Sequence, residues 1–493
     1  MNWRSTLTAL AAVAVVAAAG AASGQTTRDE EFARRQYDAG LAFLRDGRYA
    51  EALKDFQAIV DGFASSSLAD DAMLRIAEYH LDVAGDPATA MATVEALLKR
   101  YPSGTAAPFA HVLAGRVALA GGRGEAQLSG ALASFDRAVM LYPRSLVVPE
   151  ATFHAGEALQ SVRQHEEALE RFVRVSLEYP ATSWAIRADL AAARSLVAVG
   201  RAAAAPAAVQ RARSRALAAG DAALADEALR LNTILYRLYL KPQARSRFEF
   251  GQAFAGGRQI RDVVAMRFAP TGDLWVATSN GAVGYAAADG SPAGSLASAQ
   301  GRGLTVLADG SMQLVHRGGL QGARTPPRTF AAVDGRPLDD VAAAVGLSTG
   351  DVVVADRRRR AVLRFATDGR PGASFAAVNA SALAVSPMDE VAALDRDAKS
   401  VAVFDRDGRP VTRIATKGTG YQLNNPVDVA FDPLGHLYVA DRNTGQVLVF
   451  DLRGSLVTTV ASDRVRQPAA IAVDAAGRLY VADDRARQVL VFR

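Results

Sequence analysis

The chain has 493 residues, which is too long for a single compact core and favours two or more folding units. Hydrophobic residues make up 50% and charged residues 22% of the chain, so the composition excludes a disordered or collagen-like protein. The net charge is +5, and residues 241–493 carry it, with 31 basic against 25 acidic residues. Because the chain has no Cys, it can form neither a disulfide nor a thiolate metal site, and no Cys-linked lipid anchor.

The first residues predict a signal peptide. A short basic start, Met1 to Arg4, precedes an apolar run from Leu7 to Ala22 and small residues before Gln25. A membrane anchor is the alternative, but the run has about 16 residues where a spanning helix needs roughly 20. We therefore expect residues 1–24 to be a cleaved signal peptide. The mature protein should be periplasmic or secreted, with no lipid anchor and no membrane span.

Residues 27–242 have apolar residues at three- and four-residue spacing, which predicts helices, and a repeat lies within them. An Ala is followed 12 residues later by a Pro, and each Pro follows a Tyr, in three stretches: Ala90 to Pro102, Ala131 to Pro143 and Ala168 to Pro180. The small Ala lets two helices cross closely, and the Pro ends the second helix of each pair.

Two stretches carry a fuller pattern, made of Gly40, Phe43, Ala52 and Phe56 in the first and Gly156, Ala168, Phe172 and Pro180 in the other. These positions resemble the tetratricopeptide (TPR) motif, and the Tyr-Pro endings are similar to those of TPR proteins of the bacterial cell envelope. The resemblance implies about five stacked helix pairs with a concave protein-binding groove. Glu78 and Ala192 replace the glycine in two other repeats, and residues 121–129 are predicted to be an inserted loop. Residues 221–242 are predicted to form a last amphipathic helix.

Residues 243–493 contain a different repeat, made of short alternating strands. Four stretches share an Asp that ends a strand and a Phe nine residues later: Asp356 to Phe365, Asp395 to Phe404, Asp441 to Phe450 and Asp483 to Phe492. Strand, Gly turn, strand ending in Val-Ala-Asp, polar loop and strand ending in Phe resemble the NHL repeat. The resemblance implies a β-propeller, so the fold class expected for the chain is an N-terminal TPR-like α-solenoid followed by an all-β propeller.

The number of blades follows from the repeat spacing. Weaker repeats around Trp275 and Leu314 bring the count to six blades, with repeats 38 to 46 residues apart. Seven blades remain the alternative if residues 296–335 contain two degenerate units. The last repeat lacks its fourth strand, and the alternating stretch from Arg247 to Phe254 is predicted to supply it and close the ring.

No catalytic motif is convincing. Gly346 to Gly350 matches the nucleophile-elbow pattern around Ser348, but it lies in the turn of a predicted hairpin, where no helix follows. NHL-like propellers include lyases and metal-dependent lactonases, yet the only two His of this half, His316 and His436, are placed at opposite ends of their strands. The strand-end Asp residues are expected to cap loops rather than bind a cation. We therefore predict no catalytic residue, metal site or cofactor.

The clearest candidate binding surface is a set of cations in loops that leave one face of the predicted propeller. It comprises Arg357, Arg358, Arg359, Arg360, Arg396, Lys399, Arg442, Arg485 and Arg487. Such a surface would attract an acidic protein or an anionic polymer of the envelope, although solvated loop charge explains it as well. Nucleic acid is not expected, because aromatic residues are not interleaved with the cations.

The sequence as a whole favours an exported non-catalytic scaffold that binds partners through the TPR groove and this loop face. A propeller lyase or lactonase with a TPR targeting arm is the alternative.

Overall fold

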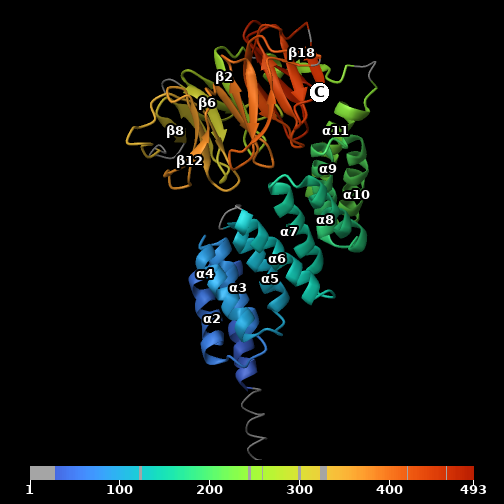
Figure 1. Ribbon diagram of the computed structural model, residues 1–493, viewed down its shortest axis with the longest axis vertical. Helices are drawn as coiled ribbons and strands as arrows, with labels where there is room; N and C mark the ends of the chain where they lie inside the picture. The colour runs from blue at the N-terminus through green and yellow to red at the C-terminus, as the bar shows by residue number, and fades with distance from the viewer. Residues whose placement is uncertain are drawn as a thin grey trace, which may run out of the picture. The chain divides into compact units, whose positions relative to one another are not determined.

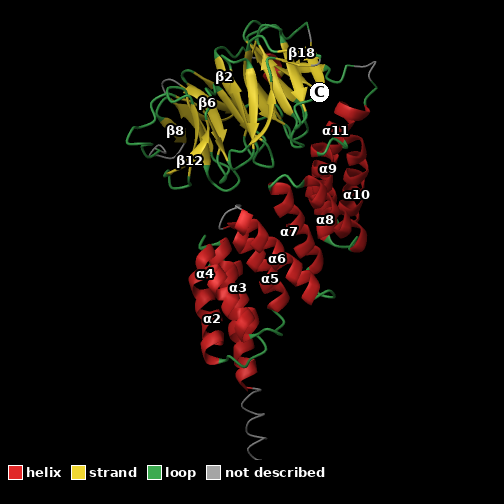
Figure 2. Cartoon of the chain, in the orientation of Figure 1, coloured by secondary structure: helices red, strands yellow, loops and turns green. Residues whose placement is uncertain are grey.

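The computed structural model describes residues 28–120, 125–242, 246–257, 259–297, 301–322, 330–418, 420–461 and 463–493. The predicted signal peptide at residues 1–24 lies outside them. By its contacts, the chain divides into two units: residues 1–162 with 170–184, and residues 163–169 with 185–493. Helices occupy the first part of the sequence and strands the second (Figures 1 and 2). The chain is an N-terminal helical repeat region followed by a six-bladed propeller, as predicted.

The helical repeats begin with a helix at residues 28–45. The further helices are α2 (Tyr49–Gly62), α3 (Ala69–Asp82), α4 (Pro87–Arg100), α5 (Ala107–Ala120), α6 (Glu125–Leu141), α7 (Val148–Ser161), α8 (His165–Glu178), α9 (Ser183–Ala198), α10 (Ala205–Ala218) and α11 (Ala222–Leu235), with the short helices η1 (Ala202–Ala204) and η2 (Tyr236–Leu240). The predicted last helix therefore exists, and the Asp221 side chain caps its start by accepting a hydrogen bond from the Leu224 backbone N–H at 3.0 Å.

The repeat residues explain why these helices pair. Phe172 of α8 is fully buried and lies against Gly156 of α7, where an added Cβ would be 2.6 Å from the Phe172 ring. Ala168, one turn earlier on α8, is also fully buried. The Tyr of the Tyr-Pro ending links repeats, because the Tyr101 hydroxyl donates to the Ala64 carbonyl at 2.7 Å. The spacing between stacked helices is thus set by the small residue, by the aromatic ring that packs on it and by the Tyr that links repeats.

One sequence prediction in this region was wrong. Residues 125–129, expected to belong to an inserted loop, form the first turns of α6, while residues 121–124 lie outside the described part of the chain. Their sequence, Glu-Ala-Gln-Leu-Ser, has good helix formers, and α6 consequently has 17 residues where most of the other helices have 14. The same repeat also has its glycine, Gly115, which was not predicted. Gly115 packs on Phe135 in the same way as Gly156 packs on Phe172.

Six antiparallel sheets form the propeller. Their strands are β2 (Val263–Phe268), β3 (Leu274–Thr278), β4 (Gly281–Tyr285) and β5 (Pro292–Ala297); β6 (Gly301–Val306), β7 (Met312–His316) and β8 (Gly319–Gly322); β9 (Val341–Gly346), β10 (Val352–Asp356), β11 (Ala361–Phe365) and β12 (Pro371–Ala376); β13 (Ala382–Val385), β14 (Val391–Asp395), β15 (Ser400–Phe404) and β16 (Pro410–Ile414); β19 (Pro426–Phe431), β20 (Leu437–Asp441), β21 (Gln446–Phe450) and β22 (Leu456–Ala461); and β23 (Pro468–Val473), β24 (Leu479–Asp483), β25 (Gln488–Phe492) and β1 (Phe250–Ala253). We number these blades I to VI in that order. A small hairpin, β17 (Lys417–Gly418) with β18 (Tyr421–Gln422), stands between blades IV and V.

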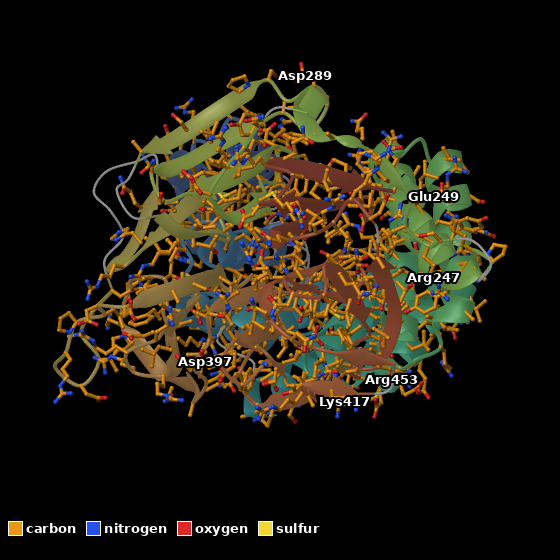
Figure 3. The ribbon with its side chains drawn as sticks, turned by 90° about the horizontal axis from the view of Figure 1, so that it is seen from above. Arg247, Glu249, Asp289, Asp397, Lys417 and Arg453 are labelled. Atoms are coloured by element: carbon orange, nitrogen blue, oxygen red, sulfur yellow. The ribbon has the colours of Figure 1, made fainter. Side chains whose placement is uncertain are left out.

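The ring closes as the sequence predicted. Strand β1 pairs antiparallel with β25, with Phe250 opposite Phe492, so residues from before blade I complete blade VI. The inner strands β2 and β23 of these two blades contact each other, and Figure 3 shows the sheets following one another around the ring. In blades III, V and VI the second strand is the most buried, since every residue of β10, β20 and β24 is buried. Neighbouring blades pack these apolar faces against each other.

Candidate functional site: a basic loop face and the propeller channel

The loops between the second and third strands are shaped by the Asp that ends each second strand. Asp356 accepts a hydrogen bond from the Arg359 backbone N–H at 3.1 Å, and Asp395 accepts one from Ala398 at 2.9 Å. Asp441 and Asp483 each bind backbone N–H groups of their own loop and of the loop leading into the same blade. These carboxylates are therefore loop caps, as predicted. Among the described residues, no group of three His, Asp or Glu side chains could hold a metal ion.

Some of the predicted cations are used within the propeller itself. Arg442 of blade V forms an ion pair with Asp484 of blade VI at 2.7 Å. Arg396 of blade IV donates to the Asn425 side chain at 2.9 Å, and Arg358 pairs with Asp339. These contacts link neighbouring loops, so part of the positive charge is neutralised internally.

Arg359 has a further structural role, because its guanidinium donates to two loop carbonyls, those of Val333 at 3.0 Å and Arg336 at 2.7 Å. The neighbouring acidic group Asp340 is held by Arg302 at 2.5 Å. That hydrogen bond, with the nearby charge of Arg357, lowers the pKa of Asp340. Sequence reasoning did not include Asp339 and Asp340 in the charge balance, although they directly precede β9.

The other five predicted cations, Arg357, Arg360, Lys399, Arg485 and Arg487, are exposed. Within the described part of the chain their side chains form no ion pair. Three of them share one position, four residues after the capping Asp, and all three have a left-handed backbone: φ is 51° at Arg360, 49° at Lys399 and 56° at Arg487. In blade V the same position is Gly445, with φ 65°. Long cationic side chains thus stand where glycine would fit without strain.

The nucleophile-elbow pattern lies in a β-turn between β9 and β10, as predicted. Its Ser348 hydroxyl donates to Asp389 at 2.6 Å, and Asp389 also pairs with Arg406. No helix follows the serine, so the strained strand-to-helix geometry of a nucleophile elbow is missing here.

His436 belongs to the opposite face, in the turn between β19 and β20, whereas His316 ends β7. The His436 ring is fully buried and lies between the Asp432 carboxylate at 2.8 Å and the Tyr239 hydroxyl at 2.6 Å. Burial raises the pKa of Tyr239 above its ordinary value, with the Asp432 charge adding to the effect. Arg237 donates to the Gly477 carbonyl on the same face. These contacts belong to the second unit and attach the end of α11 and η2 to the turns of blades V and VI.

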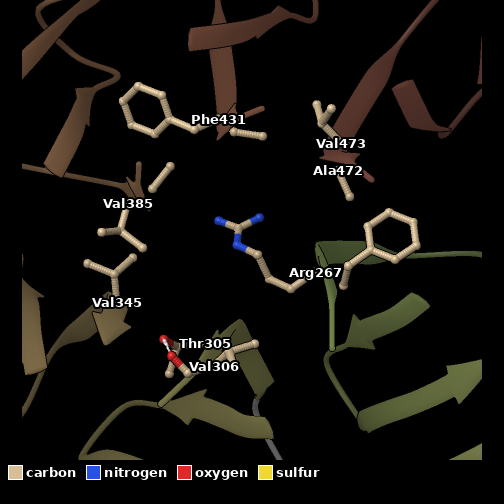
Figure 4. Close-up of a pocket in the computed structure, with 11 residues that line it drawn as sticks. Arg267, Thr305, Val306, Val345, Val385, Phe431, Ala472 and Val473 are labelled. Carbon is tan, nitrogen blue, oxygen red and sulfur yellow. Dashed lines mark hydrogen bonds between the residues drawn. The ribbon is translucent and has the colours of Figure 1, made fainter. Parts of the chain in front are cut away.

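A cavity of about 190 Å³ lies in the channel, lined by the inner strands of all six blades. Its walls are largely apolar, and Arg267 of β2 points into its centre (Figure 4). The Arg267 guanidinium donates to the carbonyls of Met266 at 2.7 Å and Leu383 at 3.0 Å and lies 3.8 Å from Asp428.

Sequence reasoning missed Arg267. The strand registers place Arg267 where the other blades have Thr305, Val345, Ala384, Ala430 and Ala472, and that exception was the available signal.

Two protein families match parts of the chain. Residues 423–450 match the NHL repeat, and residues 29–191 match the YfiO family, described as an outer membrane lipoprotein. No curated protein matches the chain as a whole or in part. None of the described helices combines the length and the apolar character that a membrane span requires.

Solved propeller structures are similar to half of the chain. A streptogramin B lyase structure is 11% identical and covers 50% of this chain and 97% of its own, with a TM-score of 0.38. A gluconolactonase from Xanthomonas campestris is 17% identical over 48% of this chain and 86% of its own, at TM-score 0.38. A virginiamycin B lyase from Staphylococcus aureus is 14% identical over 48% and 81%, at TM-score 0.36. No activity follows for this chain from likeness of this degree.

Proposed function

We propose that this protein is a non-catalytic scaffold of the bacterial envelope, whose basic loop face binds acidic segments of partner proteins. The match of residues 29–191 to an outer membrane lipoprotein family supports an envelope location. We also propose that the chain is exported through its N-terminal signal. Because it has no Cys, we propose that it is not lipidated. The TPR-like groove would offer a second protein-binding surface.

The recurrence of Arg360, Lys399 and Arg487 at one loop position carries this proposal. A left-handed backbone costs a non-glycine residue on the order of 1 kcal/mol, and glycine at Gly445 avoids that cost. Three exposed cations kept at such a position are easier to explain by binding than by stability. They add to the attraction of an anionic partner, which acts over a Debye length of about 8 Å at physiological salt.

Replacing these three residues by glycine tests the proposal. The triple variant Arg360→Gly, Lys399→Gly and Arg487→Gly should keep or raise the melting temperature, because glycine relieves the backbone strain. The Kd for immobilised poly-L-glutamate should rise at least about tenfold at 0.15 M salt, as expected for losing about 1.4 kcal/mol or more of binding free energy.

A matched control removes the same charge elsewhere, through Lys54→Ser, Arg213→Ser and Arg409→Ser, all three exposed and outside this loop face. Poly-L-glutamate binding should then change little. If both triple variants lose the same affinity, only net charge matters and the loop face is not a site. Stronger capture of polyphosphate than of poly-L-glutamate would replace the acidic protein by an anionic polymer as the partner.

A further inference from the structure

The channel contains two charged residues at positions that are small or apolar in the other blades. Arg267 stands where the other inner strands have Thr, Val or Ala, and Asp428 stands where they have Ala or Gly, as at Ala265 and Gly303. Their side chains are 20% and 6% exposed, so both charges are largely removed from water. Placing one charge in an apolar channel is costly unless a partner compensates it.

Asp428 compensates Arg267 only in part. The closest distance between the two groups is 3.8 Å, which is too long for a hydrogen bond. The carboxylate oxygens of Asp428 instead accept backbone N–H bonds, from Val429 at 2.8 Å and Ile471 at 2.9 Å. A guanidinium has five N–H donors, and the two carbonyls that it reaches use two of them. Donors therefore remain for an anion in the cavity.

The walls define the rest of the ligand. Around the guanidinium stand Val345, Val385, Phe431 and Val473, from four different blades (Figure 4). The cavity has a volume of about 190 Å³, so only a small ligand fits in it. From this geometry we propose that the propeller channel binds a small organic carboxylate with a short, branched apolar body, whose carboxylate meets Arg267 and whose body packs on these side chains. This site is separate from the basic loop face and does not depend on it.

The competing explanation is that Arg267 is a strut. Its bond to the Leu383 carbonyl joins blade I to blade IV, so the guanidinium also ties inner strands together across the channel. The two explanations differ in their response to Asp428→Asn. If Arg267 has only a structural role, losing the nearby counter-charge should lower the stability of the fold. If Arg267 is an anion site, losing that charge should raise the affinity for the ligand.

The test uses the full chain with isovalerate as the probe and isovaleramide as its uncharged match in shape. Isovalerate should raise the melting temperature and bind in calorimetry, whereas isovaleramide should do neither at the same concentration. Asp428→Asn should bind isovalerate more tightly than the unchanged chain. Arg267→Met, which keeps the length of the side chain without its charge, should weaken binding about tenfold or more, as for a lost charge-assisted hydrogen bond.

A cavity-filling variant, Val345→Phe, keeps Arg267 and should also abolish binding, so the test still works if Arg267→Met does not fold. The proposal is overturned if isovalerate has no effect on the unchanged chain up to 10-millimolar concentrations, on the order of the weakest useful affinity. It is equally overturned if Val345→Phe binds isovalerate as well as the unchanged chain does, or if the amide binds as well as the acid.

Discussion

His165, at the start of α8, is a buried imidazole that has no hydrogen-bond partner within the described residues. Burial lowers its pKa to about 4, and the nearby charge of Arg163 adds to the shift. An unfolded chain would bind a proton at this side chain near pH 6.5, the ordinary value, while the folded chain stays neutral until about pH 4. The stability contributed by the neutral ring is therefore complete above pH 6.5 and is lost as the pH falls from 6.5 towards 4.

We predict that His165→Leu removes this part of the pH dependence. Above pH 7 the variant should be as stable as the unchanged chain or slightly more stable, since an unsatisfied buried polar ring is lost. Between pH 6.5 and 4 its advantage should grow, by at most about 1.4 kcal/mol per pH unit. Urea unfolding at pH 7.5, 6.0 and 5.0, followed by helical circular dichroism, measures it. Equal differences in the free energy of unfolding at all three pH values would contradict the assignment.

Individual residues were predictable when a repeat placed them and not otherwise. The capping role of Asp441 follows from its recurrence at a strand end, and the structure confirms it. Arg267 has no counterpart in the other blades, so no period pointed to it. The partner of Arg442 lies in a loop of the next blade, and pairing between loops of different blades depends on how the blades pack, which cannot be read from one sequence.

At the scale of elements, contact between helices depends on glycines that look alike in sequence but differ in their surroundings. Gly156 of α7 faces the Phe172 ring, whereas an added Cβ at Gly130 of α6 would meet nothing within 4 Å. Both lie within helices, so helix propensity alone favours Ala at either site. Packing should reverse that preference at Gly156.

The paired substitutions Gly156→Ala and Gly130→Ala test this. Gly156→Ala should destabilise the helical repeats by about 1–3 kcal/mol through overpacking, while Gly130→Ala should stabilise them by about 0.5–1 kcal/mol. Thermal melts followed by helical circular dichroism distinguish them. If both variants melt at the same temperature, the repeat register that sets Gly156 on Phe172 is wrong.

The elements themselves were largely evident from periodicity. Strands of blades V and VI have nearly identical sequences, so their bounds could be read directly, as in Leu437–Asp441 and Leu479–Asp483. The start of α6 could not, because a weak repeat and its glycines suggested a loop where helix formers continue the helix. Domain bounds at 24 and at 242/243 remain predictions.

For the whole molecule, the central feature is that β1 closes the ring. Residues 247–493 contain β1 and should fold alone, whereas a chain that begins at Ile260 lacks it and leaves the edge of β25 unpaired. We expect the shorter chain to lack a cooperative thermal transition followed by strand circular dichroism. A chain beginning at Arg247 that carries Phe250→Ala controls for loss of one side chain only, and should still melt cooperatively at a lower temperature. A cooperative melt of the chain from Ile260 would show that closure does not need β1.

This closure has a consequence for how the protein is made. The contacts of blade VI join residues that leave the ribosome far apart in time: the Gln488 side chain donates to the Gly257 carbonyl, 231 residues earlier. Contacts so distant in sequence form slowly, because a long loop must close before they stabilise anything. As the chain emerges from the ribosome or from the export machinery, the helical repeats can fold first, but the propeller can close only after its last strand has emerged. Until then β1 and the blades already formed expose unpaired strand edges, so a holding chaperone should be needed more for the propeller than for the helices.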